Sequence, residues 1–216
     1  MPKKIRVTRV ETPETREQAL SVLRSTYRDE KRWVIEAESQ LPESDLNESQ
    51  ISWFVALRDE EPVGVLRIHY QPPVAQYREY EIDLLDQRID VDQFLRTNRI
   101  AEIGRFAIVP SCRRNLMIAV ALMRAATRET VERGFTHYIT DVFENDPHSP
   151  YGFHTRVMGF AAVATHERGE LRCASRRITL ILDLKAAYQR LRRSRNWIFR
   201  SLTADWDEGL HRQLAI

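Results

Sequence analysis

The sequence predicts one α/β domain with a mixed sheet flanked by helices, and three observations lead to that prediction. Strand-like and helix-like segments alternate along the 216 residues without an internal repeat or a Gly/Ser linker. Residues 51–57 and 63–69 are rich in β-branched and apolar side chains and are joined by a short polar turn, which indicates a hairpin. Residues 116–126 are almost entirely apolar, which is typical of a helix buried on most of its faces.

The other elements follow from periodicity and from residues that mark helix ends. Pro13 after Thr12 indicates a helix start, and Gly134 indicates a helix end. The predicted strands lie at residues 5–10, 51–57, 63–69, 99–109, 135–143, 160–166 and 171–184. The predicted helices run from Pro13 towards Trp33 with a break, over 91–96, over 112–133, up to Gly159 and over 185–200. We expect residues 41–48 and most of 71–99 to be polar loops.

Composition excludes several classes of protein. A formal net charge of +2 provides no strong overall field, so any electrostatic binding must be local. Cys112 and Cys173 show neither metal-ligand spacing nor a disulfide framework, so we expect reduced thiols and no metal site. The first residues contain no apolar signal segment, and no apolar run approaches the roughly 20 residues that span a bilayer. We therefore expect a soluble, cytoplasmic protein.

The segment 105–119 joins an apolar strand to the buried helix. A helix start offers unpaired N–H groups and the positive end of the helix dipole, so it can hold a phosphate. Arg113 and Arg114 add positive charge there. The alternative is that the two arginines are surface residues at a helix start and bind no ligand.

This junction resembles the phosphate-binding turn of the GNAT acyltransferase superfamily, which reads Arg/Gln-x-x-Gly-x-Gly/Ala. Arg114, Met117 and Ala119 fall on those positions, so Met117 replaces the family's glycine. Residues 144–160 are similar to a second signature, an Asn followed by a helix that ends in Gly-Phe. In that helix, Thr155 stands where many acetyltransferases have a tyrosine that serves as general acid.

Three further segments resemble acyl-homoserine-lactone synthases and N-acyl amino acid synthases. Residues 23–33 are similar to their Leu-Arg…Tyr/Phe…Trp opening, 101–108 to their Glu-x-x-Arg-Phe strand, and 53–68 to their strand pair with Val-Gly-x-x-Arg. The resemblance covers roughly residues 5–184. It implies the GNAT fold, with a mostly antiparallel twisted sheet in residues 1–184. Residues 185–216 are then a C-terminal helical extension, packed on the same domain and including an extra basic helix.

The resemblance also implies where substrates bind. The acyl donor is expected at the junction and at one later asparagine: Phe106, Ala107, Ile108, Arg113, Arg114, Asn115, Leu116, Met117, Ile118, Ala119 and Asn145. Arg24, Trp33 and Arg67 are expected in the acceptor and acyl pocket, although an aromatic residue such as Trp33 is often plain core. No tightly bound cofactor is expected.

Glu102 and Arg105 are the candidate catalytic residues. An amine attacks a thioester only as the free base, so a carboxylate or an ordered water must take its proton. Glu102 is a carboxylate in an otherwise apolar strand, and the alternative is a structural ion pair with Arg105 or Arg99. Strict alternation puts Glu102 and Arg105 on opposite faces, but a bulge at Gly104 would change that phase and free backbone N–H groups beside the thioester.

Two histidines and one cysteine near these motifs are weaker candidates. His148 and His154 have no partner Asp or Cys at a convincing spacing, and a lone loop histidine is more often a surface or capping group. Cys112 lies at the turn, but direct transfer needs no thiol, so we expect it to pack in the core.

The segment from Lys185 to Arg200 is strongly basic and contains Trp197, Ile198 and Phe199. The simplest interpretation is a solvated helix with an apolar edge. The alternative is a docking surface, Arg190–Arg200, for an acidic acyl carrier protein. Nucleic acid is not expected, because the rest of the chain is balanced in charge. A weak contact with a membrane surface is left open.

Three classes of function remain. The preferred one is an N-acyltransferase that moves an acyl group from pantetheine thioester, on acyl carrier protein or CoA, to a small amine such as an amino acid. Carrier-bound pantetheine has one phosphodiester, so a turn without glycine at Met117 would suffice for it. The other two are an ordinary acetyl-CoA-dependent acetyltransferase and a non-catalytic binding module of the same fold.

Overall fold

The computed structural model describes residues 4–72, 79–169, 171, 175–194 and 197–215. Within them, one sheet has the strand order β1-β2-β3-β5-β6-β8-β7-β4. Its strands are β1 (Ile5–Arg9), β2 (Ile51–Arg58), β3 (Glu61–Tyr70), β4 (Asp83–Leu84), β5 (Ile100–Ile108), β6 (His137–Phe143), β7 (Ala161–His166) and β8 (Arg177–Asp183). Every neighbouring pair is antiparallel except β5 with β6, as the resemblance implied.

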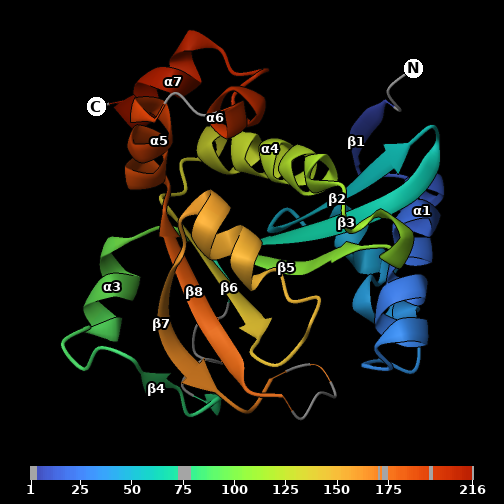
Figure 1. The fold of residues 1–216 in the computed structure, drawn as a ribbon, viewed down its shortest axis with the longest axis horizontal. Coiled ribbons are helices and arrows are strands. Elements are labelled where there is room, and N and C mark those ends of the chain that lie inside the picture. The colour runs from blue at the N-terminus through green and yellow to red at the C-terminus, as the bar shows by residue number, and fades with distance from the viewer. Residues whose placement is uncertain (1–3, 73–78, 170, 172–174, 195–196, 216) are drawn as a thin grey trace.

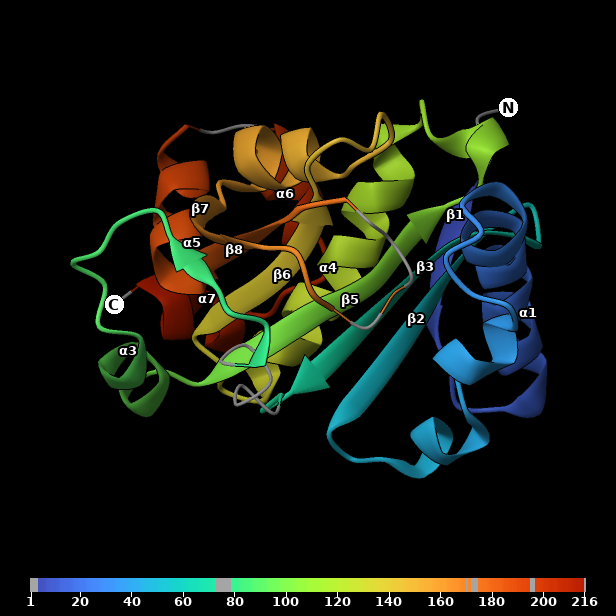
Figure 2. The same cartoon turned by 90° about the horizontal axis from the view of Figure 1, so that it is seen from below.

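Helices cover both faces of this sheet (Figure 1). The helical segments are α1 (Pro13–Leu23), η1 (Arg24–Glu30), η2 (Ala37–Gln40), η3 (Glu43–Asn47), α3 (Val91–Thr97), η4 (Pro110–Cys112), α4 (Leu116–Glu132), η5 (Phe153–Met158), α5 (Leu184–Arg193), α6 (Trp197–Leu202) and α7 (Glu208–Ala215). The segments η1 and η5 are π-helices. Figure 2 shows α1 at one end of the sheet and α3 with β4 at the other.

The core has two main layers, one on each face of the sheet. Leu20 and Leu23 of α1 pack on Trp53 and Val65 on one face. The apolar face of α4 packs with Leu66, Ile68 and Ile103 on the other. Close packing of α4 depends on Gly64, where a Cβ would lie 3.1 Å from side-chain atoms of Ile118 and Leu122. Two covered faces explain why residues 52–57 of β2 are all buried.

The parallel strands β5 and β6 are paired over only a short stretch, which leaves a gap in the sheet between their remaining residues. Its register runs only from Ile100↔His137 to Glu102↔Ile139 within the described strands. Beyond it, the two strands separate, and the Thr140 hydroxyl donates to the Ile103 carbonyl at 2.8 Å. The separation creates a space at the carboxyl end of β5, next to the start of α4.

Several boundaries differ from the sequence prediction. The helix predicted from Cys112 begins at Leu116, because Asn115 caps it by accepting from Met117 N and a 3-10 turn precedes it. The basic helix predicted over 185–200 is two helices, α5 and α6. The structure adds β4 and α7, which the polar stretches containing them did not indicate; a two-residue strand has too little periodicity to detect.

The C-terminal helices pack against the end of α4 (Figure 1). Ile198, Leu202, Leu210 and Leu214 are buried in the same apolar cluster as α4. None of the helices in the described part of the chain is both long and apolar enough to cross a membrane.

Candidate active site

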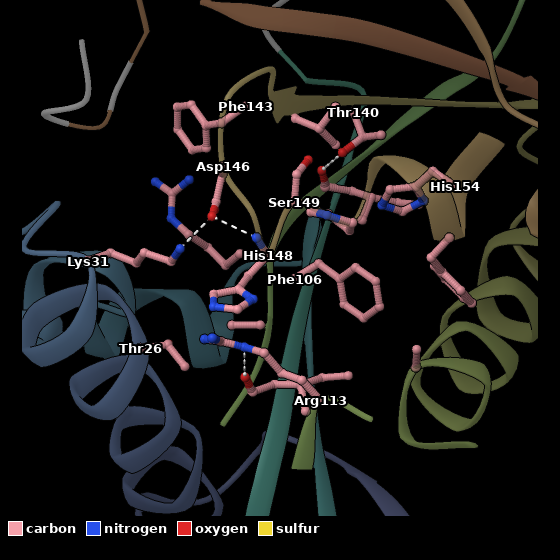
Figure 3. A pocket seen from close by; sticks show the side chains of 18 of the residues that line it. Thr26, Lys31, Phe106, Arg113, Thr140, Phe143, Asp146, His148, Ser149 and His154 are labelled. Atoms are coloured by element: carbon pink, nitrogen blue, oxygen red, sulfur yellow. Dashed lines mark hydrogen bonds and ion pairs between the residues drawn. The ribbon is translucent and has the colours of Figure 1, made fainter. Parts of the chain in front are cut away.

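A cleft of about 370 Å³ lies where β5 and β6 separate. Figure 3 looks into it, with Phe106 near its centre and His154 at one side. Its walls come from β5, β6, the start of α4, the segment 26–33, and the loop and helix at 146–154. The polar groups at its edges are set among five aromatic side chains: Tyr27, Trp33, Phe106, Phe143 and Phe153.

A β-bulge in β5 forms the floor of the cleft. The register with β3 shifts between Val65 and Arg67, and Arg105 takes a left-handed backbone with φ of 51°. The bulge that we expected at Gly104 therefore turns on the next residue. A non-glycine residue in this region costs about 1–3 kcal/mol, and such strain is concentrated at functional sites.

The bulge is followed by backbone groups that face the opening. Val109 N donates to the Val63 carbonyl at 3.0 Å, so the backbone of Val109 faces β3. Because neighbouring strand residues point their polar groups to opposite edges, the N–H and carbonyl of Ile108 face the cleft. Arg113 Nε donates to the Ile108 carbonyl at 3.1 Å, and the Ile108 N–H points into the same opening.

The junction residues divide into two groups. The predicted donor residues that line the cleft are Phe106, Ala107, Ile108, Arg113, Asn115, Leu116 and Ala119. Four others lie outside the lining. Arg114 and Met117 are exposed to solvent, Ile118 is fully buried under the sheet, and Asn145 belongs to the loop after β6.

The segment 30–33 contacts residues from two sides of the cleft, and we call it the strap. Glu30 pairs with Arg113, and Lys31 Nζ lies 2.5 Å from Asp146 Oδ1. The Trp33 ring packs on Phe143, with centroids 4.4 Å apart. The hydrogen bond from Arg113 lowers the pKa of Glu30, so the carboxylate of this pair stays charged to a lower pH than a free glutamate does.

Of the three residues predicted for the acceptor and acyl pocket, Trp33 lines the cleft, whereas Arg24 and Arg67 lie outside its lining. Arg24 lies on η1 and is held by Glu17 and Glu38, with Nε 2.9 Å from Glu38 Oε1. Arg67 Nη2 donates to Glu102 Oε1 at 2.9 Å. The structural ion pair considered for Glu102 is therefore made with Arg67 rather than with Arg99 or Arg105.

The Arg67–Glu102 pair lies beside the floor of the cleft without lining it. Both side chains are nearly buried, with 11% and 12% of their surface exposed. The Arg67 guanidinium covers Gly104, where a Cβ would come within 2.9 Å of Nη2. Glu102 Oε2 is buried and has no hydrogen-bond partner among the described residues.

A second carboxylate, Asp141 of β6, does line the cleft. Its Oδ1 accepts from the Thr179 hydroxyl at 2.8 Å and lies 3.2 Å from His166 Nε2. The other ring nitrogen of His166 is 2.7 Å from the Arg168 carbonyl. A carbonyl can only accept, so Nδ1 donates to it, and the ring is held with Nε2 towards the Asp141 carboxylate. This arrangement fixes the Asp141 carboxylate at the cleft wall.

The two histidines noted in the sequence both line the cleft. The backbone N–H of His148 donates to Asp146 Oδ1 at 2.9 Å, next to the ion pair of the strap. His154 is fully buried, and burial lowers the pKa of its imidazole to about 3. Thr155 lies outside the lining, and its hydroxyl is bonded to the Tyr151 carbonyl at 2.8 Å.

Sequence reasoning missed the part of the site built by the strap and by β6. Lys31 and Asp146 gave no local signal, because 115 residues separate these two partners. The alternation of β6 alone could have placed Asp141 on the face opposite Tyr138 and Val142. Cys112 is buried in the core, as expected, and Cys173 and Arg195 lie outside the described residues.

Comparisons with known proteins identify the family and the fold. The model of the acetyltransferase (GNAT) family matches residues 16–160. Comparison with curated proteins yields no significant match.

Three solved structures illustrate the likeness of the fold. FeeM, an N-acyl amino acid synthase from uncultured soil microbes, is 15% identical, with a TM-score of 0.68 over 90% of this chain and 98% of its own. Aminoglycoside 6'-N-acetyltransferase complexed with coenzyme A is 13% identical, with a TM-score of 0.57 over 82% of this chain and 96% of its own. NAA60 from Arabidopsis thaliana, in complex with acetyl-CoA, is 14% identical, with a TM-score of 0.58 over 84% and 99%.

Proposed function

Because the chain belongs to the GNAT acetyltransferase family and is an acyltransferase, we propose that it transfers a long acyl group from a pantetheine thioester to the amine of a small molecule such as an amino acid. The observation that carries this proposal is the aromatic lining of the cleft beside the open backbone of β5. A cavity walled by aromatic rings suits an acyl chain better than an acetyl group alone. The likeness to FeeM supports the same class of product.

Transfer requires polarisation of the thioester carbonyl and removal of a proton from the amine. The N–H groups that follow the bulge at Arg105 are the proposed donors to the carbonyl oxygen. The amine nitrogen forms the new bond to the carbonyl carbon, the carbon–sulfur bond breaks, and the amine proton goes to a base. The products are an amide and a free thiol.

Two carboxylates compete for the role of base. Glu102 is our first candidate, supported by its buried Oε2 without a partner among the described residues and by its place two residues before Gly104, which lines the cleft. Asp141 is the second, favoured because its own side chain lines the cleft.

The two candidates can be separated with Glu102→Gln and Asp141→Asn. Loss of the true base is expected to lower kcat by about 10²–10⁴-fold and to remove its limb from the pH–rate profile. The other substitution should change kcat by less than about tenfold. If both variants keep the wild-type profile, an ordered water takes the proton and neither carboxylate is the base.

The product class is tested by mass spectrometry of lipids from cells that express the protein. New N-acyl amino acids should accumulate with the wild type and be absent with the variant that lacks the base. If no such lipid forms while purified protein acetylates small amines from acetyl-CoA, the ordinary acetyltransferase is correct. If the protein binds acetyl-CoA without any turnover, the binding module is correct.

We keep acyl carrier protein as the preferred donor, docking at Arg190–Arg200. In support, Arg190 Nη2 donates to the Met158 carbonyl at 2.7 Å, so α5 touches the end of η5, whose first turn lines the cleft. Arg192, Arg193 and Arg200 line a groove beside it. Arg192→Ala with Arg193→Ala should raise KM for acyl carrier protein several-fold and leave KM for acyl-CoA unchanged. Equal effects on both donors would exclude docking there.

A further inference from the structure

The buried imidazole of His154 has no structural explanation in the fold around it. The ring lies among Phe106, Phe153 and Phe160, with centroid distances of 5.5, 5.6 and 4.8 Å. Neither Nδ1 nor Nε2 has a hydrogen-bond partner among the described residues, although none of the residue's surface is exposed. Each buried polar atom without a partner destabilises a fold, and phenylalanine would fill the same space without that loss.

The local backbone turns this side chain towards the cleft. His154 belongs to the π-helix η5, where one residue more per turn changes which positions face inward. As a result His154 lines the cleft, while the hydroxyl of the neighbouring Thr155 bonds back to its own helix. Figure 3 shows the His154 ring at one side of the cleft, with Phe106 nearer the centre.

The charge state of the His154 imidazole limits the ligand groups that it can bind. An imidazole that stays uncharged has one N–H donor and one nitrogen acceptor. It therefore suits a neutral ligand group with its own donor or acceptor, and not a phosphate, which the guanidinium of Arg113 matches better. The pantetheine arm of an acyl donor is neutral and carries amide and thioester groups of this kind along an otherwise apolar chain.

We propose that His154 hydrogen-bonds the pantetheine arm of the acyl donor inside the cleft. This inference rests on the proposed function, because it needs a pantetheine thioester as substrate. When the donor binds, the ring gains the partner that the free protein does not provide. The aromatic residues around it exclude water, so that the hydrogen bond is stronger than it would be in solvent.

Calorimetry with two ligands tests the proposal. Acetyl-CoA contains the pantetheine arm, and 3′,5′-ADP contains only the nucleoside of CoA and two of its three phosphates. In His154→Phe, the dissociation constant of acetyl-CoA should rise about tenfold, as expected for one lost hydrogen bond. The affinity for 3′,5′-ADP should not change. Thr155→Val is the matched control on the same helix and should bind both ligands as the wild type does.

The outcomes separate this inference from the function on which it rests. If wild-type protein binds neither acetyl-CoA nor S-acetylpantetheine, the donor class is wrong and His154 loses its role with it. If the wild type binds acetyl-CoA and His154→Phe binds it equally well, only the His154 inference is overturned.

A second measurement uses the wild-type protein, so its result does not depend on whether a variant folds. In wild-type protein with ¹⁵N-labelled histidine, the ring nitrogens of one uncharged histidine should shift when acetyl-CoA is added. They should not respond to 3′,5′-ADP. If the ring nitrogens of every uncharged histidine keep their ¹⁵N chemical shifts when acetyl-CoA is added, the proposal is wrong.

Discussion

At the residue scale, His154 links the stability of the fold to pH. Burial lowers the pKa of its imidazole to about 3, whereas an unfolded histidine titrates near 6.5. Between these values the unfolded state binds more protons than the folded state, so stability falls as pH falls below about 6.5. This contribution levels off near pH 3, where the folded state is protonated as well.

His154→Phe should remove that dependence. The variant is expected to be at least as stable as the wild type at pH 7.5. Its advantage should grow on acidification by at most about 1.4 kcal/mol per pH unit. Urea unfolding at pH 7.5, 5.5 and 4.5 measures the difference. A constant difference across this range would mean that His154 takes up its proton at the same pH in the folded protein as in the unfolded chain.

Glu129 is the second residue whose contacts make a sharp prediction. Its Oε1 accepts from the Ser52 hydroxyl at 2.5 Å, the Tyr70 hydroxyl at 3.1 Å and Arg133 Nη2 at 2.9 Å. Glu129→Ala leaves these groups without their acceptor and should lower the free energy of unfolding by about 3 kcal/mol. Glu132→Ala, which breaks only an exposed pair with Arg128, should cost under about 0.5 kcal/mol. Equal losses in urea unfolding would contradict this distinction.

At the element scale, local sequence signals predicted what is local. Thr12 and Pro13 begin α1, and Gly134 ends α4 with φ of 72°, because caps and left-handed turns depend on adjacent residues. The strap was not predicted, since Lys31 is 115 residues from its partner Asp146. The bulge was expected from Gly104, yet the left-handed residue is Arg105, because the register with β3 decides which residue turns.

The strap should hold as one unit. The Lys31–Asp146 pair is largely shielded, with 17% and 9% of the side-chain surface exposed. A double-mutant cycle of Lys31→Ala and Asp146→Ala is expected to give a coupling energy of about 1–2 kcal/mol in thermal unfolding. The same cycle on the exposed pair Arg88–Asp86 should give under about 0.5 kcal/mol. A coupling near zero would show that the Lys31–Asp146 pair does not stabilise the strap, and that the Glu30–Arg113 pair and the packing of Trp33 hold it.

At the scale of the whole molecule, the C-terminal helices complete the core on which the cleft depends. The first turn of α4 borders the cleft, and the same helix packs against α6 and α7. Tyr188 of α5 ties these helices together, because its hydroxyl lies 2.9 Å from His211 Nδ1 and its ring stacks on Trp206. The sequence indicated a basic segment and a polar tail here, since only every third or fourth residue is apolar and their burial depends on α4.

Removal of α5, α6 and α7 should therefore prevent the rest of the chain from folding stably. A chain that ends at Leu184 exposes the apolar cluster around α4 and is expected to be insoluble or to lack a cooperative unfolding transition. Leu210→Ala in the full chain is a milder version, because Leu210 is 4% exposed and its truncation should cost about 2–4 kcal/mol. Ile35→Ala, at a side chain that is 70% exposed, should stay within about 0.5 kcal/mol of the wild type. The prediction is wrong if residues 1–184 alone unfold cooperatively at the urea midpoint of the full chain. In that case the C-terminal helices pack on α4 without stabilising the fold. The groove at Arg192 and Arg193 would then be free to serve docking alone.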